Sequence, residues 1–191
     1  MLLGVPLGVA LGLRRFPGRN LLVTLVNSGM GLPPVVVGLF VFVLLARSGP
    51  LGNLHLLYTP TAMVLAQTIL ATPLVVGVTL AGIQGLDERM QLQILSLGAS
   101  RWQLYGKLLL EARVALLAAL AAGFGAIISE VGAVMMVGGN IEGQTRVMTT
   151  AIVLEARQGN LPLAIALSLV LLLLAALVNG LFTWLQQRGA R

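Results

Sequence analysis

Charge is what this sequence has least of. Only 9% of its 191 residues are charged, whereas soluble domains average about a quarter. Hydrophobic residues make up 58% of the chain, which leaves too little polar surface for a globule in water. The same abundance of Leu, Val and Ala excludes disorder. The composition therefore predicts a polytopic membrane protein.

Cysteine is absent, and the chain has one His and six carboxylate side chains. These absences exclude disulfide scaffolds, thiolate zinc sites and thiol catalysis, so we expect no catalytic residue and no metal site. The net charge is +6, but aromatic residues make up 5% and basic residues form no long run. We therefore expect no nucleic-acid partner, because excess Arg in a membrane protein reports orientation.

Four apolar segments are long enough to cross a bilayer, which takes about 20 residues. They are Leu21–Ala46, Thr61–Leu86, Val114–Val137 and Leu161–Leu185. A fifth segment, Met1–Leu13, is too short to span and lacks the basic start of a signal peptide. We expect it to be the end of a transmembrane helix that begins upstream, giving about five transmembrane segments with the first one truncated.

Basic residues are distributed unequally between the two sides of these spans. One side carries nine, namely Arg14, Arg15, Arg19, Arg89, Arg101, Lys107, Arg113, Arg188 and Arg191, against Arg47, Arg146 and Arg157 on the other. Cytoplasmic loops carry the excess of Lys and Arg. The loop at 86–113 and the C-terminus are therefore predicted to be cytoplasmic.

The first of these spans contains the sequence NSGMGLPP, from Asn27 to Pro34. Pro33 and Pro34 remove backbone donors, so a helix must bend or break there. Broken backbone at membrane depth lies either inside protein or along a wet cavity. Two interpretations remain open, a position beside a pore and a purely structural kink.

The longest cytoplasmic connection runs from Gly85 to Arg113. Met90, Ile94 and Leu97 are spaced as one helix face, and a second helix is expected around Leu104 and Leu108. The segment between them is a turn, with Ser100 as a helix N-cap. Such a pair of short helices suits either a partner's socket or the lipid headgroups.

The segment LSLGASRWQLYGKLLL resembles the coupling loop of ABC importer membrane subunits, with Gly98 at the family's Gly position. The family's Glu-Ala-Ala triplet is replaced by Leu92, Gln93 and Ile94, and Glu111 stands where many members have Pro. The resemblance implies that an ATPase contacts Leu97, Gly98, Ala99, Ser100 and Arg101.

A second block, ISEVGAVMMVGGNIEGQTRVMTTAI, resembles the molybdate/tungstate permease group, most closely its tungstate branch, as do GLRRFPGR and MGLPPVVVGL. The resemblance extends over essentially the whole chain. It implies an all-α, type I importer bundle in a bacterial inner membrane, with residues 1–191 forming a single permease domain.

Glu130 lies sixteen residues after Val114 within an apolar span. A carboxylate at such depth costs about 2.5–3.5 kcal/mol on insertion scales, so it needs a partner. We expect a structural brace with Arg146 or Asn140. The alternative is contact with a passing oxyanion, for which Asn140, Thr145 and Arg146 are better suited than Glu130. Asn27, Pro33 and Pro34 complete the candidate path or gate.

No G-x-x-x-x-G-K-[ST] motif occurs, so we expect no nucleotide cofactor on this chain. The resemblance implies a homodimer in the lipid membrane that works with two ABC ATPase subunits, which bind ATP and Mg²⁺, and an extracytoplasmic oxyanion-binding protein. The predicted function is import of an oxyanion, most closely tungstate. Import of molybdate or sulfate remains an alternative, and so does a stand-alone secondary carrier or channel.

Overall fold

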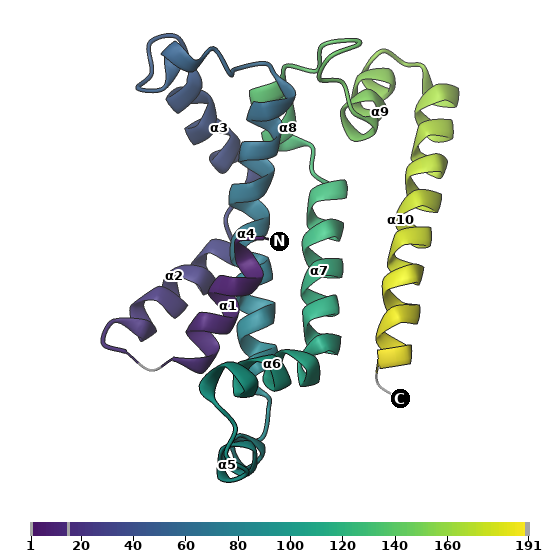
Figure 1. Cartoon of the computed structure of the whole chain (residues 1–191). Helices are drawn as coiled ribbons and strands as arrows, with labels where there is room; N and C mark the ends of the chain where they lie inside the picture. Colours follow the sequence, from purple (N-terminus) through teal and green to yellow (C-terminus); the bar gives the residue numbers. More distant parts are fainter. Residues whose placement is uncertain (1, 15, 190–191) are drawn as a thin grey trace. The chain divides into compact units, whose positions relative to one another are not determined.

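The computed structural model describes residues 2–14 and 16–189, and within these ranges the chain forms helices and no strand (Figure 1). The helices are α1 (Gly4–Leu13), α2 (Arg19–Met30), α3 (Pro34–Leu45), η1 (Gly52–Leu54), α4 (Pro60–Gln84), α5 (Glu88–Ser96), α6 (Arg101–Glu111), α7 (Arg113–Ile128), α8 (Gly132–Gly138), α9 (Met148–Arg157) and α10 (Leu161–Gly189). Met1, Arg15 and Arg191, which belong to the predictions above, lie outside the described residues. The all-α prediction is confirmed.

In the described part of the chain, α4 and α10 are each long and apolar enough to cross a membrane. Two helix pairs, α2 with α3 and α6 with α7, raise the number of candidate spans to four if each counts as one span. The segment Met1–Leu13 contributes the short apolar helix α1. Between α2 and α3 the helix is interrupted at residues 31–33, next to Pro33 and Pro34, as predicted.

The predicted span Val114–Val137 is not one continuous helix, because α7 ends at Ile128 and α8 begins at Gly132. The Ser129 hydroxyl donates to the Gly125 carbonyl at 2.8 Å, so it occupies an acceptor at the end of α7. Polar side chains that bond to nearby backbone in this way compete with a continuous helix. At its other end α7 meets α6 at a bend of 62°, and by length and composition alone the two helices qualify together as one broken span.

Two compact units divide the chain. Unit 1 comprises Met1–Met30, Thr72–Gly123 and Leu181–Arg191. Within it α1 packs against α4 through glycines. A Cβ at Gly8 would lie 2.6 Å from the Thr79 Cβ, and one at Gly4 or Gly12 would lie 2.8 or 2.6 Å from a side chain of α4. We call Gly4, Gly8 and Gly12 the glycine seam. Its glycines let the two backbones approach closely, as small residues do between membrane helices.

Unit 2 comprises Gly31–Ala71 and Phe124–Gly180. Its core is a cluster of buried apolar residues from α3, α4 and α8, namely Val37, Val41, Leu45, Ala62, Met63, Ala66, Ala133, Val134 and Val137. The close approach of α3 to α8 depends on Gly38, since a Cβ there would lie 2.7 Å from the Ala133 Cα. The Tyr58 N–H donates to the Val137 carbonyl at 2.9 Å and ties the loop before α4 to the same core.

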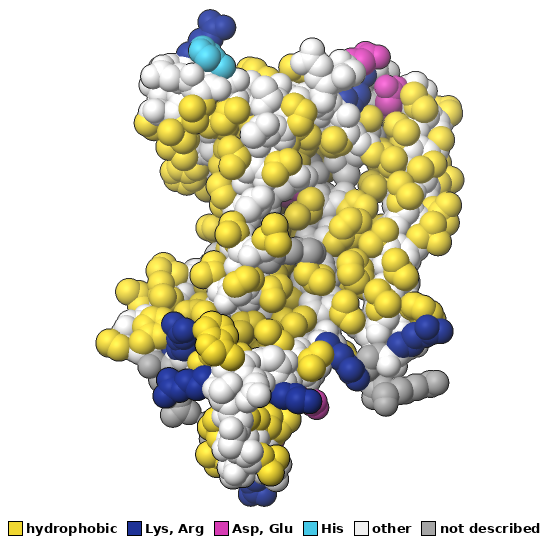
Figure 2. Space-filling view, in the orientation of Figure 1, with side chains coloured by type: hydrophobic (Ala, Val, Ile, Leu, Met, Phe, Trp, Pro, Cys, Tyr) yellow, Lys and Arg dark blue, Asp and Glu magenta, His cyan; other side chains and the backbone are white. Residues whose placement is uncertain are grey.

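The helix surfaces of both units are largely apolar in Figure 2. In unit 2, α10 exposes a succession of leucines, Leu169, Leu172, Leu173 and Leu177. Soluble proteins rarely expose so much contiguous apolar surface. In a membrane protein these leucines are suited to contact with lipid tails.

Candidate functional site

The loop predicted to contact an ATPase forms two helices joined by a tight turn within unit 1. At the end of α5, the Gly98 N–H donates to the Leu95 carbonyl at 3.0 Å and the Ala99 N–H donates to the Ile94 carbonyl at 3.4 Å. This pair of bonds is the Schellman pattern, which requires a left-handed residue after the helix. Gly98 adopts φ +82°, a conformation that costs glycine little.

The second helix of the loop begins at a capping box, as predicted from Ser100. The Ser100 hydroxyl accepts from the Gln103 N–H at 3.4 Å, while the Gln103 side chain accepts from the Ser100 N–H at 2.8 Å. On α6, Leu104 and Leu108 are buried. The turn is therefore fixed by hydrogen bonds on both sides of Ala99, and α6 is anchored in unit 1.

The tip of this loop is open. Leu97 is 87% exposed and Trp102 is 84% exposed, and a Cβ at Gly98 would have no atom within 4 Å. Next to the turn lies an open groove of about 630 Å³ between α5 and α6, with Ile94 and Leu110 on its walls. Arg89, Arg101 and Lys107 add positive charge to α5 and α6, and Figure 2 shows dark blue side chains scattered over this lower part of the view. The loop therefore presents apolar side chains, a groove and positive charge without a covering element in the described chain.

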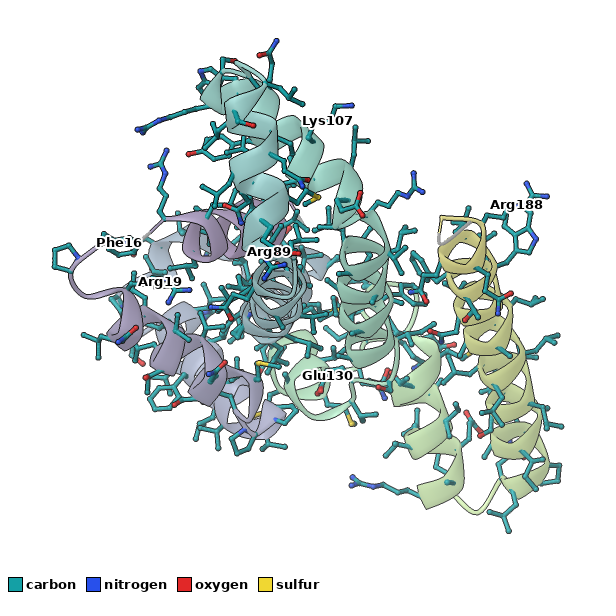
Figure 3. All side chains as sticks on the ribbon, turned by 90° about the horizontal axis from the view of Figure 1, so that it is seen from below. Phe16, Arg19, Arg89, Lys107, Glu130 and Arg188 are labelled. Atoms are coloured by element: carbon teal, nitrogen blue, oxygen red, sulfur yellow. The ribbon has the colours of Figure 1, made fainter. Side chains whose placement is uncertain are left out.

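Glu130 lies between α7 and α8 in unit 2, where Figure 3 labels it, and its side chain is buried. One carboxylate oxygen accepts from the Ala133 N–H at 2.8 Å, in the first turn of α8. The Glu130 backbone carbonyl accepts from the Thr149 hydroxyl at 3.1 Å. The predicted brace between Glu130 and Arg146 or Asn140 is therefore wrong. Glu130 is braced instead by Ala133, through its carboxylate, and by Thr149, through its backbone carbonyl.

Asn140, Thr145 and Arg146 are brought together in the loop between α8 and α9. Thr145 is 1% exposed, and its hydroxyl donates to the Gly138 carbonyl at 2.6 Å and accepts from the Ile141 N–H at 2.9 Å. Arg146 pairs with Glu142 at 3.2 Å rather than with Glu130. Thr145 therefore fixes the loop, and its hydrogen is already donated to protein.

The loop leaves two polar atoms without a described partner, the Asn140 Oδ1 and the Arg146 Nε. The Arg146 side chain is 28% exposed, so its guanidinium is both positive and reachable. Of the candidates in this loop, Arg146 is best suited to meet an anion.

A cavity of about 300 Å³ in unit 2 connects Glu130 with residues that sequence reasoning did not single out. Gln67 and Thr149 contribute polar groups to its lining, and the remainder is apolar. Thr149 could have been suspected from the adjacent pair TT in an apolar stretch, because a buried hydroxyl needs a partner. Gln67 gives no such signal, since one amide in a long helix is ordinary.

The other predicted positions flank the interruption between α2 and α3. Asn27 is exposed on α2, Pro33 precedes α3 with φ −64°, and Pro34 is its first residue. Pro at the first position of a helix replaces an N–H that has no intrahelical partner. These residues account for the break, and whether they line a path stays a prediction.

Residues 4–191 match the family described as "Binding-protein-dependent transport system inner membrane component". The chain belongs to this family. Membership agrees with an all-α membrane protein.

Individual members of the family are similar over most of their length. A probable anion ABC transporter permease protein of Haloferax volcanii is 44% identical over 184 residues, covering 94% of this chain and 79% of the relative. The tungstate uptake system permease protein TupB of Peptoclostridium acidaminophilum is 41% identical, covering 96% and 80%. A sulfate transport system permease protein, CysT of Escherichia coli, is 31% identical, covering 93% and 66%.

The candidate residues of this inner membrane component fall into two sets with different surroundings. The α5–α6 loop is exposed and unpartnered, which suits a contact with another subunit. The Glu130 and Arg146 region is buried or braced, which suits part of the membrane-embedded structure. Each set lies within its own unit, unit 1 for the loop and unit 2 for the second region.

Proposed function

We propose that this chain is the transmembrane subunit of an ATP-driven importer of an oxyanion, and that the oxyanion is tungstate. The chain acts as one transmembrane domain over residues 1–191 and pairs with a second copy of itself to form the pore. It has no ATPase site of its own, so a separate ABC ATPase supplies the energy.

The observation that carries this proposal is the geometry of the α5–α6 loop. Leu97 is exposed at its tip, Gly98 leaves open space beside the turn, and Leu104 anchors α6. An apolar tip on a stiff, anchored turn suits insertion into a socket better than a helix that merely lies on lipid. We name the segment from Leu97 to Arg101 the coupling tip.

Tungstate is supported by the relatives, of which one is named as a tungstate permease and is 41% identical, while a sulfate permease is 31% identical. On this chain, Arg146, which is partly exposed, is the cation of the α8–α9 loop that we assign to the doubly charged anion. An external binding protein is expected to make most of the selection, because tungstate and molybdate share charge and shape.

The orientation follows from the charge tally, with the coupling tip and the C-terminus in the cytoplasm. ATP and Mg²⁺ then bind on the two ATPase subunits, which contact the coupling tip. Closure of the ATPases moves the coupling loop and opens the pore toward the binding protein. When the closed ATPases open again, the pore returns to its inward-facing state.

The test is reconstitution of the chain with its ATPase and binding protein in vesicles. We expect ATP hydrolysis to rise when tungstate-loaded binding protein is added, and labelled tungstate to accumulate only with ATP. A mass measurement on the complex should give two copies of this chain and two ATPases. A mass with one copy, or uptake without any ATPase, contradicts the proposal and favours a stand-alone carrier.

A molybdate or sulfate importer is the second candidate, and the same vesicles distinguish it. Competition of unlabelled molybdate and sulfate against labelled tungstate ranks the anions directly. If unlabelled molybdate or sulfate competes more strongly than unlabelled tungstate, that anion is the substrate, and the proposed mechanism is unchanged.

A further inference from the structure

Two open cavities in unit 1 flank the end of α1. The first, of about 580 Å³, runs along α1 past Val5, Val9 and Leu109. The second, of about 640 Å³, has Leu7, Leu11 and Leu22 on its walls. Both are lined mainly by apolar side chains, so each is suited to a hydrocarbon chain rather than to a polar solute.

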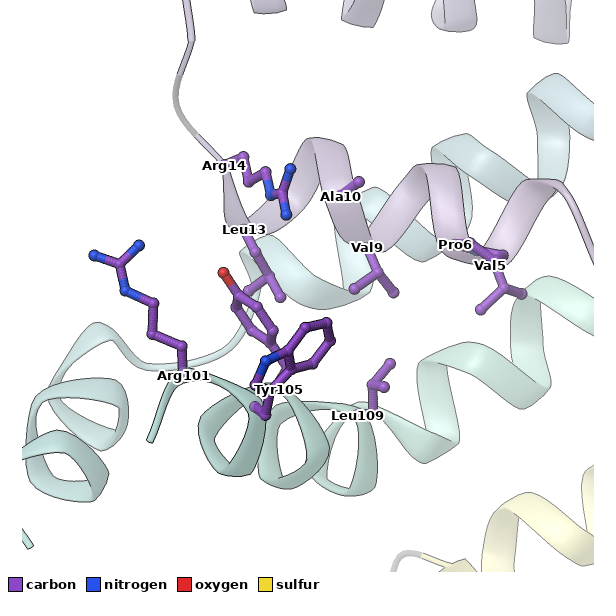
Figure 4. A pocket seen from close by; sticks show the side chains of 10 residues that line it. Val5, Pro6, Val9, Ala10, Leu13, Arg14, Arg101, Tyr105 and Leu109 are labelled. Carbon is purple, nitrogen blue, oxygen red and sulfur yellow. The ribbon is translucent and has the colours of Figure 1, made fainter. Parts of the chain in front are cut away.

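The two cavities share their polar end. Arg14, Arg101 and Tyr105 belong to the lining of both. Figure 4 shows Arg14 and Arg101 at one end of the first cavity and Val5 and Pro6 at the other. In the part of the chain that the structure describes, neither arginine has an ion pair, although Arg146 has one with Glu142. Two unpaired positive charges therefore lie where two apolar cavities meet.

The surroundings of this junction are fixed. The Arg19 Nε donates to the Leu11 carbonyl at 2.8 Å and ties the start of α2 to α1. Figure 3 labels Arg19 and Phe16 in this part of unit 1. Trp102 and Tyr105 contact each other edge to face at 6.2 Å between ring centroids. Aromatic rings of this kind are frequent at the level of lipid headgroups.

We propose that these two cavities bind one anionic phospholipid of the cytoplasmic leaflet. Its phosphate lies between Arg14 and Arg101, and its two acyl chains occupy the two cavities on either side of α1. Binding requires no covalent step. The inference rests on the proposed orientation, which puts the end of α1 on the cytoplasmic side.

Charge complementarity decides the occupant. A zwitterionic lipid brings its own cation to the junction, whereas an anionic headgroup leaves its phosphate free for both guanidinium groups. Basic pockets between membrane helices on the cytoplasmic side are suited to anionic headgroups. A free oxyanion could meet the same arginines, but it would leave both apolar cavities without an occupant.

The experiment measures lipid retention by the purified full chain in detergent, using native mass spectrometry. The probes are phosphatidylglycerol and phosphatidylcholine with identical acyl chains. We expect one phosphatidylglycerol to be retained in preference to phosphatidylcholine. Arg14→Gln and Arg101→Gln should each lower its retention about fivefold, in line with the contribution of one basic residue near an anionic surface.

The matched control is Arg89→Gln, which removes a cation from α5 that lines neither cavity. This variant should retain phosphatidylglycerol like the unchanged chain. Val9→Trp tests the acyl cavity, because it fills the first cavity while keeping both arginines, and retention should fall. Thermal unfolding of each variant identifies any variant that fails to fold. If Val9→Trp fails, the two arginine variants still decide the test, because Arg14 and Arg101 are exposed.

Three results overturn the proposal. These are equal retention of the two lipids, an equal loss in Arg89→Gln, and displacement of phosphatidylglycerol by millimolar inorganic phosphate or tungstate. The last result means that the junction binds a free oxyanion. The assay contains no ATPase and no binding protein, so its failure is distinguishable from failure of the proposed transport function.

Discussion

The Thr149 hydroxyl donates a hydrogen bond of 3.1 Å to the backbone carbonyl of Glu130, nineteen residues earlier in the chain. The Glu130 carboxylate in turn accepts from the Ala133 N–H at 2.8 Å. Glu130 and Thr149 are both buried. Glu130, in the non-helical segment between α7 and α8, therefore contacts two helices. Its backbone carbonyl binds the start of α9, and its carboxylate binds the first turn of α8.

Thr149→Val keeps the shape of the side chain and removes this tie. We expect the free energy of unfolding to fall by about 1 kcal/mol, because a buried carbonyl loses its donor. In thermal unfolding of the purified chain, the Tm should fall by about 2–4 °C. Thr24→Val is the control, because the Thr24 hydroxyl donates to the Asn20 carbonyl on an exposed helix face. Equal shifts in both variants contradict the role assigned to Thr149.

Glu130→Gln and Glu130→Leu separate hydrogen bonding from charge. Gln keeps an oxygen for the Ala133 N–H, so the variant should fold and insert, with tungstate uptake lowered because a neutral acceptor binds more weakly than a carboxylate. Leu leaves that N–H without its partner, at a cost of about 1–3 kcal/mol. The yield of the folded, proposed dimer should therefore fall only for Glu130→Leu. Normal yield and uptake in Glu130→Leu would falsify the brace.

Gly98→Asp and Gly159→Asp form a matched pair for the coupling tip. The two glycines have φ +82° and +81°, and a Cβ at either position would meet no atom within 4 Å. The backbone strain is therefore similar, at about 1–2 kcal/mol. We expect both variants to insert, but only Gly98→Asp to lose ATPase association and uptake, measured by co-purification and by vesicle transport. Full association in Gly98→Asp means that the loop is only a surface helix.

Gly8→Ala and Gly125→Ala test the glycine seam. A Cβ at Gly8 would lie 2.6 Å from the Thr79 Cβ, whereas one at Gly125 would meet nothing within 4 Å. Both positions are inside helices, so both gain about 0.5–1 kcal/mol in helix propensity. Overpacking at Gly8 should outweigh this gain by costing about 1–3 kcal/mol. The Tm should therefore fall for Gly8→Ala and rise for Gly125→Ala. A higher Tm for Gly8→Ala contradicts close packing of α1 on α4.

Periodicity and turn chemistry predicted the α5–α6 loop well. The Ser100 cap, the turn at Gly98 and the apolar face of α6 depend on residues within a few positions of one another, so local sequence determines them. The interruption next to Pro33 and Pro34 was predictable for the same reason. The family resemblance rested on the loop, on GLRRFPGR and MGLPPVVVGL, and on the block from Ile128 to Ile152, and the comparisons confirmed it.

The break after Ile128 was not predicted, because hydrophobicity alone does not distinguish one long helix from two short ones. At the break, the side chains of Ser129 and Glu130 form hydrogen bonds to nearby backbone, and hydrophobicity does not report such bonds. The partner of Glu130 was missed for a related reason. The expected partners were charged and polar side chains, whereas the donor to the Glu130 carboxylate is a backbone N–H three residues away, that of Ala133.

The Schellman turn at Gly98 and the capping box at Ser100 have a consequence for recognition. The angle between α5 and α6 is set by backbone and cap hydrogen bonds, so the loop needs no partner to adopt it. Little conformational entropy is then lost when the proposed ATPase binds, which favours affinity from a small contact area. A stiff loop can also transmit displacement in both directions, so the same contact can drive the opening of the proposed pore and its return.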